Sequence, residues 1–187
     1  MVDEDKPRLL LHICCAPDGT VPALDLAAEG WDVTGFFYGS NIQPEEEYRR
    51  RLDALHILTE RAGFPALEAC YAPEGWTAVM TKRGLMDEPE GGRRCTACFA
   101  LQLEAAAQEA ARQGCSHLCT TLTISPHKDA ERINRIGAEI AASHGFLWEN
   151  RIWRKRNGFL RSIRLSKEWG LYRQRYCGCL PSRRGNT

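Results

Sequence analysis

Six cysteines in three tight clusters are the residues of this sequence best suited to chemistry. Thiolates at such short spacings commonly hold a metal ion or an iron–sulfur cluster. Neighbouring cysteines are poorly placed to bridge to each other, because a relaxed disulfide needs Cα atoms about 4.4–6.8 Å apart with converging Cβ vectors. The clusters, each beside a turn signal, are Cys14-Cys15, Cys95-x-x-Cys98 and Cys177-x-Cys179.

The number of thiols distinguishes between kinds of metal site. A closed structural zinc site takes four ligands, whereas six clustered thiols are present here and Asp18 follows Cys15 by three residues. Seven candidate ligands fit a four-iron cluster plus a second metal, or a cluster with an open iron. A four-cysteine zinc site with two further cysteines is the alternative. A disulfide framework is less favoured, because the chain is not small and shows no secretory signal. The solitary Cys70, Cys115 and Cys119 are predicted to pack in the core.

Length and composition predict an ordinary globular protein. The chain has 187 residues, with 43% hydrophobic and 26% charged residues, so we expect a single domain spanning residues 1–187. The apolar run at 9–13 is too short for a signal peptide or a membrane span. We therefore expect a cytoplasmic protein that does not enter a membrane and whose thiols stay reduced and available for metal.

The net charge of +1 hides an uneven distribution. Residues 1–150 carry 14 Lys and Arg against 23 Asp and Glu, whereas residues 151–187 carry 11 basic residues against one acid. A basic segment interleaved with aromatic residues suits an RNA loop whose bases can stack. The alternative is a basic tail that contacts only the acidic body of the same protein. The candidate RNA-binding residues are Trp153, Arg154, Lys155, Arg156, Tyr172 and Arg175.

Alternating strands and helices predict an α/β fold with a parallel sheet. Ligands of such sheets bind beyond the carboxyl ends of the strands. Cys14 and Cys15 follow the first strand directly, and Cys95 and Cys98 fall at the start of a helix, whose positive end stabilises thiolates. His12, inside the first strand, is more typical of a core histidine than of a ligand. The expected strands are 9–13, 32–38, 66–71, 117–122 and 146–150, and the expected helices are 21–29, 44–62, 74–82, 98–113 and 126–144.

Other chemistries are disfavoured by what the motifs lack. Neither a Gly-x-Gly-x-x-Gly nor a Gly-x4-Gly-Lys-Ser/Thr sequence occurs, so nucleotide hydrolysis is disfavoured. A dithiol oxidoreductase built on Cys95 and Cys98 would leave four clustered cysteines unexplained. A sulfur-transfer enzyme acting on tRNA through a persulfide would need a sulfur donor and ATP activation, and the phosphate loop for that is absent.

The sequence resembles the QueH-type epoxyqueuosine reductases over nearly its whole length, from Leu9 to Cys179. Seven motifs in order carry the resemblance, which makes it specific although each motif alone is weak. They are His12-Ile-Cys-Cys-Ala-Pro-Asp18, Asn41-Ile-Gln-Pro-Glu-Glu-Glu-Tyr48 with Arg51, Arg94-Cys-Thr-Ala-Cys-Phe99, Thr120-Thr-Leu-Thr-Ile-Ser-Pro-His-Lys128, Trp153-Arg-Lys-Arg-Asn-Gly158, Ser166-Lys-Glu168 and Leu171-Tyr-Arg-Gln-Arg-Tyr-Cys-Gly-Cys179.

The resemblance implies the last step of queuosine synthesis. That step removes the epoxide oxygen of epoxyqueuosine at the wobble position of tRNAs for Tyr, His, Asp and Asn. The resemblance also implies a Rossmann-like layer of the adenine-nucleotide hydrolase type, a [4Fe-4S] cluster and a second metal ion, either iron or zinc. The metal ligands it implies are Cys14, Cys15, Asp18, Cys95, Cys98, Cys177 and Cys179, with the 151–187 segment completing the site. In such families the pair Cys177 and Cys179 can instead be a redox-active disulfide.

We expect the chemistry to need a low-potential electron donor, because removing the oxygen takes two electrons. Asp18 is the expected oxygen ligand of the second metal or a proton relay, and His127 or Tyr176 is the expected proton donor to the leaving oxygen. Arg154, Lys155 and Arg175 are expected to hold phosphates of the anticodon loop. The main alternative from another functional class is a zinc-stabilised RNA-binding module without catalysis.

Overall fold

A sheet of five parallel strands forms the centre of the protein. The computed structural model describes residues 6–183. The strands are β1 (Arg8–Ile13), β2 (Asp32–Phe37), β3 (Ala66–Glu68), β4 (His117–Thr120) and β5 (Leu147–Trp148), in the spatial order β3-β2-β1-β4-β5. Every residue of β1 after Arg8 is buried, because a central strand of a parallel sheet is covered on both faces and is therefore apolar throughout.

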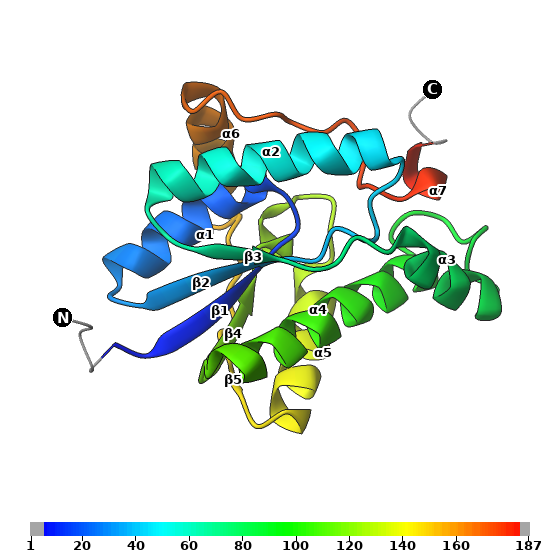
Figure 1. Cartoon of the computed structure of the whole chain (residues 1–187), viewed down its shortest axis with the longest axis horizontal. Helices are drawn as coiled ribbons and strands as arrows, with labels where there is room; N and C mark the ends of the chain where they lie inside the picture. Colours follow the sequence, from blue (N-terminus) through cyan, green and yellow to red (C-terminus); the bar gives the residue numbers. More distant parts are fainter. Residues whose placement is uncertain (1–5, 184–187) are drawn as a thin grey trace.

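Helices cover both faces of the sheet (Figure 1). One face carries α1 (Ala16–Ala28), α2 (Glu45–Ala62) and α6 (Gly158–Glu168), and the other carries α4 (Arg93–Gln113) and α5 (Ala130–Ser143). The side chains of β1 alternate between these layers: Leu9 and Leu11 pack with α1 and α2, whereas Leu10 packs against the alanines of α4. Two short helices, α3 (Pro73–Lys82) and α7 (Leu180–Arg183), lie outside this alternation.

The prediction of an α/β fold with a parallel sheet is confirmed, while several helix boundaries were wrong. Helix α1 begins at Ala16 rather than at residue 21, with Pro17 in its first turn, a position where proline loses no hydrogen bond. Helix α5 begins at Ala130 rather than at residue 126, because the Asp129 side chain accepts a hydrogen bond from the Arg132 amide at 3.0 Å and caps it. Residues 126–128 consequently form a turn.

The basic segment 151–187, which the sequence analysis treats as a basic C-terminal extension, packs against the body of the protein over its described part. It contains α6, which packs on α1. Arg161 of α6 donates two hydrogen bonds to Asp25 of α1, at 3.0 and 2.7 Å. Residues 169–179 then run across α2 toward the carboxyl ends of the strands (Figure 1). Part of the basic charge therefore neutralises acids of the same protein, as the alternative interpretation predicted.

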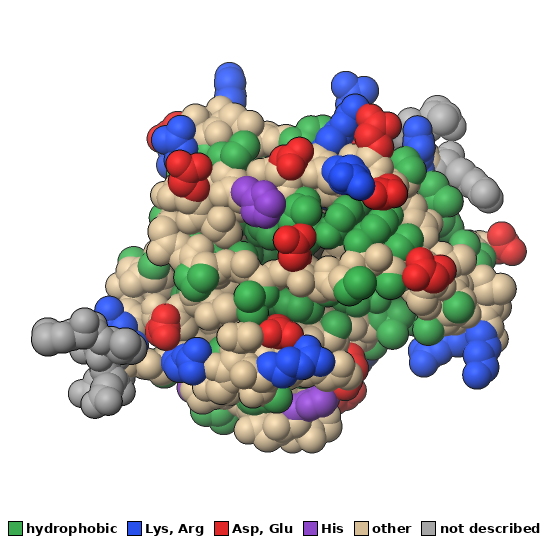
Figure 2. All heavy atoms as spheres, in the orientation of Figure 1, with side chains coloured by type: hydrophobic (Ala, Val, Ile, Leu, Met, Phe, Trp, Pro, Cys, Tyr) green, Lys and Arg blue, Asp and Glu red, His purple; other side chains and the backbone are tan. Residues whose placement is uncertain are grey.

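The surface carries charges of both signs. On the face shown in Figure 2, basic and acidic side chains are intermixed along the edge above α2. Two exposed Glu–Arg pairs, Glu45–Arg49 and Glu46–Arg50, lie on α2. Among residues 6–183, no helix combines the length and the apolar character needed to cross a membrane.

Candidate metal centre

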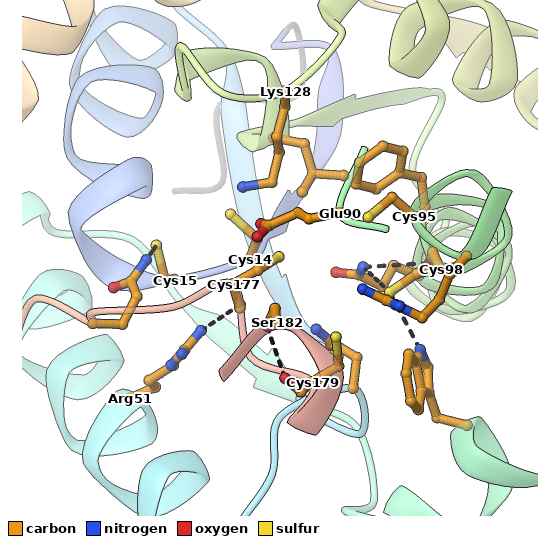
Figure 3. A pocket seen from close by; sticks show the side chains of 17 residues that line it. Cys14, Cys15, Arg51, Glu90, Cys95, Cys98, Lys128, Cys177, Cys179 and Ser182 are labelled. Carbon is orange, nitrogen blue, oxygen red and sulfur yellow. Dashed lines mark hydrogen bonds between the residues drawn. The ribbon is translucent and has the colours of Figure 1, made fainter. Parts of the chain in front are cut away.

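All six clustered cysteines line one pocket at the carboxyl ends of β1 and β4 (Figure 3). They come from three parts of the chain: the β1–α1 junction, the first turns of α4 and the segment before α7. A doubly wound sheet places its ligand site at this edge. The prediction that the distant clusters lie together is therefore confirmed. All nine cysteines are free thiols, including Cys177 and Cys179.

Cys14, Cys15 and Asp18 form the most compact group of candidate ligands. Their sulfur and carboxylate oxygen atoms all lie within 4.8 Å of one another. The Cys14 thiol donates to Asp18 Oδ2 at 3.4 Å, and the Thr121 hydroxyl at the end of β4 donates to Cys14 Sγ at 3.4 Å. Cys15 is the N-cap residue of α1, so the positive end of that helix favours negative charge on the group. Two thiols and one carboxylate suit a single metal ion.

Cys95 and Cys98 lie on one side of the first turns of α4, which begins at Arg93. The Gly91 amide donates to Cys95 Sγ at 3.2 Å. Cys98 Sγ accepts two N–H bonds, from Trp76 Nε1 at 3.2 Å and from Gln102 Nε2 at 3.1 Å. These sulfurs are therefore oriented into the pocket by fixed donors.

Cys177 and Cys179 are held in the pocket by a buried arginine of α2. Arg51 is 2% exposed and forms an ion pair with Glu47 at 2.8 Å. Its other guanidinium nitrogens donate to the carbonyl oxygens of Cys177 at 2.9 Å and Tyr176 at 3.0 Å. Arg51 therefore fixes the backbone that carries the last cysteine pair.

The electrostatics of the pocket favour neutral thiols until a cation binds. Burial raises the pKa of Cys177 to about 11, and it also raises the pKa of Cys95 and of Cys98. Lys128 is half-buried, and Figure 3 shows its ammonium group pointing into the pocket beside Cys14. Burial lowers the pKa of Lys128, but the nearby Cys177, Cys14 and Asp18 raise it by more, so the pKa of Lys128 lies above its usual value. Lys128 is therefore charged.

Two cations at the pocket, one buried and one half-buried, are compatible with a negatively charged metal–thiolate group. Arg94 is 2% exposed, and its Nε atom has no hydrogen-bond partner. Its Nη1 atom donates to the backbone carbonyls of Met86 and Glu88. Among the described residues, neither Arg94 nor Lys128 has a carboxylate within ion-pair distance. A group of bound metal and thiolates that carries negative charge would compensate both cations.

Several predicted site residues lie elsewhere. Trp153 is 7% exposed and its Nε1 donates to the Thr120 carbonyl at 3.0 Å, so its ring cannot stack on a base in this structure. Arg154 donates to the carbonyls of Ser125 and Lys128 and braces that loop. His127 is exposed and outside the pocket lining. The Tyr176 hydroxyl donates to the Gln43 carbonyl at 2.6 Å, away from the thiols.

The remaining predicted residues divide between surface and core. Lys155 and Arg156 are exposed, while Tyr172 and Arg175 line a groove beside the pocket. His12 is fully buried, and its Nδ1 lies 2.9 Å from Thr120 Oγ1. Burial lowers the pKa of His12 to about 3, which agrees with a core histidine. Cys115 and Cys119 are buried as predicted, but the prediction for Cys70 was wrong, because Cys70 is exposed.

The sequence analysis missed the polar residues around the sulfurs. Gln102 carried a signal, because it follows Cys98 by one helical turn. Arg94 adjoins Cys95, and Arg51 stood inside a recognised motif. Gln174 also stood inside a recognised motif, whereas Trp76 carried no signal. Gln174 Nε2 donates to Cys15 Sγ at 2.9 Å across 159 residues of sequence, a contact that only the fold creates.

The family profile and the related proteins that match this chain all carry the same family description. The sequence profile of the family described as "Epoxyqueuosine reductase QueH" matches residues 9–185. A protein of that name from Histophilus somni is 38% identical over 179 residues, covering 95% of this chain and 72% of the relative. The one from Streptococcus pyogenes is 36% identical, covering 94% and 70%. The one from Thermotoga maritima is 36% identical, covering 93% and 89%.

Among solved structures, the chain is similar to the U34-tRNA thiolase NcsA from Methanococcus maripaludis with its [4Fe-4S] cluster. The TM-score is 0.53, and the match covers 90% of this chain and 58% of NcsA. The sequence identity is 11%, so this similarity concerns the fold.

Proposed function

The chain belongs to the epoxyqueuosine reductase QueH family and is an oxidoreductase, and we propose that it reduces epoxyqueuosine to queuosine in tRNA with an iron–sulfur cluster and an adjacent metal ion. The observation that carries the proposal is the convergence of six thiols and Asp18 on one edge of the sheet. Removal of the epoxide oxygen takes two electrons and two protons and yields an alkene and water. We propose a low-potential protein or small-molecule donor for the electrons, and the tRNAs for Tyr, His, Asp and Asn as substrates.

The two groups of ligands suggest how the metals divide. Cys14, Cys15 and Asp18, with their ligand atoms within 4.8 Å, would hold the single metal ion. Cys95 and Cys98, together with Cys177 and Cys179 across the pocket, would hold a [4Fe-4S] cluster. When bound, the cluster supplies electrons one at a time and the adjacent metal supplies a Lewis acid. The solved tRNA thiolase of the same fold carries a [4Fe-4S] cluster, which is consistent with a cluster on this fold and does not identify its ligands.

The protons must come from groups at the pocket. Lys128 is charged and points into it, whereas His127 is exposed and the Tyr176 hydroxyl is bonded to the Gln43 carbonyl. We therefore assign Lys128 as the proton donor to the leaving oxygen. Asp18, 8% exposed and bonded to Cys14, remains the proposed metal ligand or relay.

A groove beside the metal pocket suits the anticodon loop. It has a volume of about 490 Å³ and lies between the start of α2 and the segment before α7. Tyr172 and Arg175, both predicted to bind RNA, line it. Arg50, Arg183 and the Tyr176 ring also line the groove, together with Glu46, which pairs with Arg50, and Glu47, which pairs with the buried Arg51. Its arginines and aromatic rings favour phosphates and stacked bases. Because Arg51 joins this groove to Cys177, RNA seated there would place its wobble base near the thiols.

The proposal is tested by anaerobic reconstitution followed by iron and sulfide counts and an assay with epoxyqueuosine-containing tRNA. The wild-type protein is expected to bind at least four irons with about four sulfides per cluster and to form queuosine when a strong reductant is supplied. Cys98→Ser is expected to lose both the brown colour and the activity. Cys70→Ser is the matched control, because Cys70 is exposed and outside the pocket. One zinc and no sulfide in the wild type would refute the proposal.

A further inference from the structure

Cys98 is the pocket cysteine whose sulfur is most strongly hydrogen-bonded. Within the described residues it is the only one of the six that accepts two side-chain N–H bonds, from Trp76 at 3.2 Å and Gln102 at 3.1 Å. Cys15 accepts one such bond, from Gln174, and Cys95 accepts one from a backbone amide. The two donors to Cys98 come from different elements, α3 and α4, so they approach the sulfur independently.

Helix α3 is placed so that its tryptophan reaches this sulfur. It lies outside the regular alternation of strands and helices, and only Trp76 and Met80 of its residues are buried. Both pack in a cluster that contains Cys98 and Cys179. Trp76 is 1% exposed, and a buried indole N–H needs a partner. The Cys98 sulfur is that partner.

The Gln102 side chain is likewise held close to the Cys98 sulfur. It is 3% exposed and follows Cys98 by one turn of α4. Its amide nitrogen also lies 3.3 Å from the Cys98 carbonyl, which holds the side chain against its own helix. Two rigid donors on one sulfur stabilise negative charge there much more than they stabilise a neutral thiol.

We propose that Trp76 and Gln102 are positioning residues that raise the reduction potential of the iron–sulfur cluster through their N–H bonds to Cys98 Sγ. The inference rests on the proposed function, in which Cys98 is a cluster ligand. Reduction adds one negative charge to the cluster and its thiolates. Hydrogen-bond donors therefore stabilise the reduced state more than the oxidised state, and the potential rises. Helix α3 thus adjusts the electron affinity of the site through the hydrogen bond from Trp76 to Cys98.

The test measures the midpoint potential of the reconstituted protein by a titration followed by electron paramagnetic resonance. Trp76→Phe removes the indole N–H but keeps an aromatic ring in the cluster, and Gln102→Met removes the amide N–H at similar length. Trp148→Phe is the matched control, because Trp148 Nε1 donates to Asn134 at 3.0 Å outside the pocket lining. Iron and sulfide are counted in every sample.

Each pocket variant is expected to keep its cluster and to lower the equilibrium constant for reduction about threefold or more. At 59 mV per tenfold for a one-electron couple, this is a downward shift of about 28 mV or more. The control is expected to keep the wild-type potential. Wild-type potentials in both loaded pocket variants would overturn the inference while leaving the proposed function intact. So would loss of the cluster from both variants with unchanged thermal unfolding, because the donors would then serve assembly. A wild-type protein without a cluster would instead refute the proposed function.

Discussion

Replacing Arg51 by methionine tests whether one buried ion pair holds the cysteine-bearing C-terminal segment in place. Three Glu–Arg pairs follow one another on α2 with the same spacing of four residues. The side chains of Arg49 and Glu45 are 72% and 58% exposed, whereas those of Arg51 and Glu47 are 2% and 8% exposed. The helix therefore contains its own control, identical in sequence spacing and different in burial.

The expected cost follows from the contacts of Arg51. Its removal leaves the Glu47 carboxylate buried, and among the described residues the Tyr172 hydroxyl, which donates to it at 2.8 Å, is its remaining side-chain partner. It also frees the carbonyls of Tyr176 and Cys177. Breaking a buried pair on one side costs about 3–5 kcal/mol. For a domain of this size, that corresponds to a fall in melting temperature of roughly 6–20 °C.

The assay is urea unfolding of Arg51→Met beside Arg49→Met, with iron content measured after reconstitution. Arg49→Met is expected to unfold like the wild type, because exposed ion pairs contribute little. Arg51→Met is expected to lose about 3–5 kcal/mol of its unfolding free energy and to bind less iron. Adding Glu47→Leu to Arg51→Met should restore part of the stability, because no unpaired charge then remains buried. Equal unfolding free energies for the two single variants would refute the reasoning.

Three further predictions concern the RNA surface, a pocket thiol and the start of α6. Lys155 is exposed, and Lys155→Ala should reduce the slope of log K for tRNA binding against log salt concentration by about 0.7–0.9. The control, Arg112→Ala at the far end of α4, should leave the slope unchanged. Equal slopes for the two variants would place Lys155 outside the RNA surface. Because burial, the largest cause, raises the pKa of Cys177 to about 11, its alkylation in the metal-free protein should be slow at pH 7 and rise about tenfold per pH unit toward pH 11; mass spectrometry of the modified peptide measures this, and a plateau below pH 9 would contradict it. Gly158→Ala should destabilise the fold strongly, because a Cβ there would lie 1.7 Å from the Trp153 carbonyl oxygen; a thermal melt unchanged from the wild type would contradict that geometry.

The sheet and the position of the site could be predicted because they depend on local sequence. The run at 9–13 is apolar since a central parallel strand is buried on both faces, and cysteines directly after it must lie at the carboxyl edge. Helix α6 escaped prediction for a physical reason. Its buried residues are Gly158, Ser162 and Ser166, whereas Leu160 is 63% exposed. Small residues let α6 pack closely on α1, so the apolar pattern does not mark the buried face.

The surroundings of the sulfurs could not be predicted, because they depend on contacts between distant residues. Trp76, which donates to Cys98, lies 22 residues away from it in the sequence, and Arg51, which donates to the Cys177 carbonyl, lies 126 residues away from that cysteine. A ligand must be a thiol or a carboxylate, so residue type and spacing reveal it. A neighbour that orients the ligand needs only one N–H group at the right place, and arginine, glutamine, tryptophan and glycine all supply one here. The ligand motifs in the sequence therefore predict which atoms can bind a metal, whereas the hydrogen bonds and charges around those atoms depend on the fold.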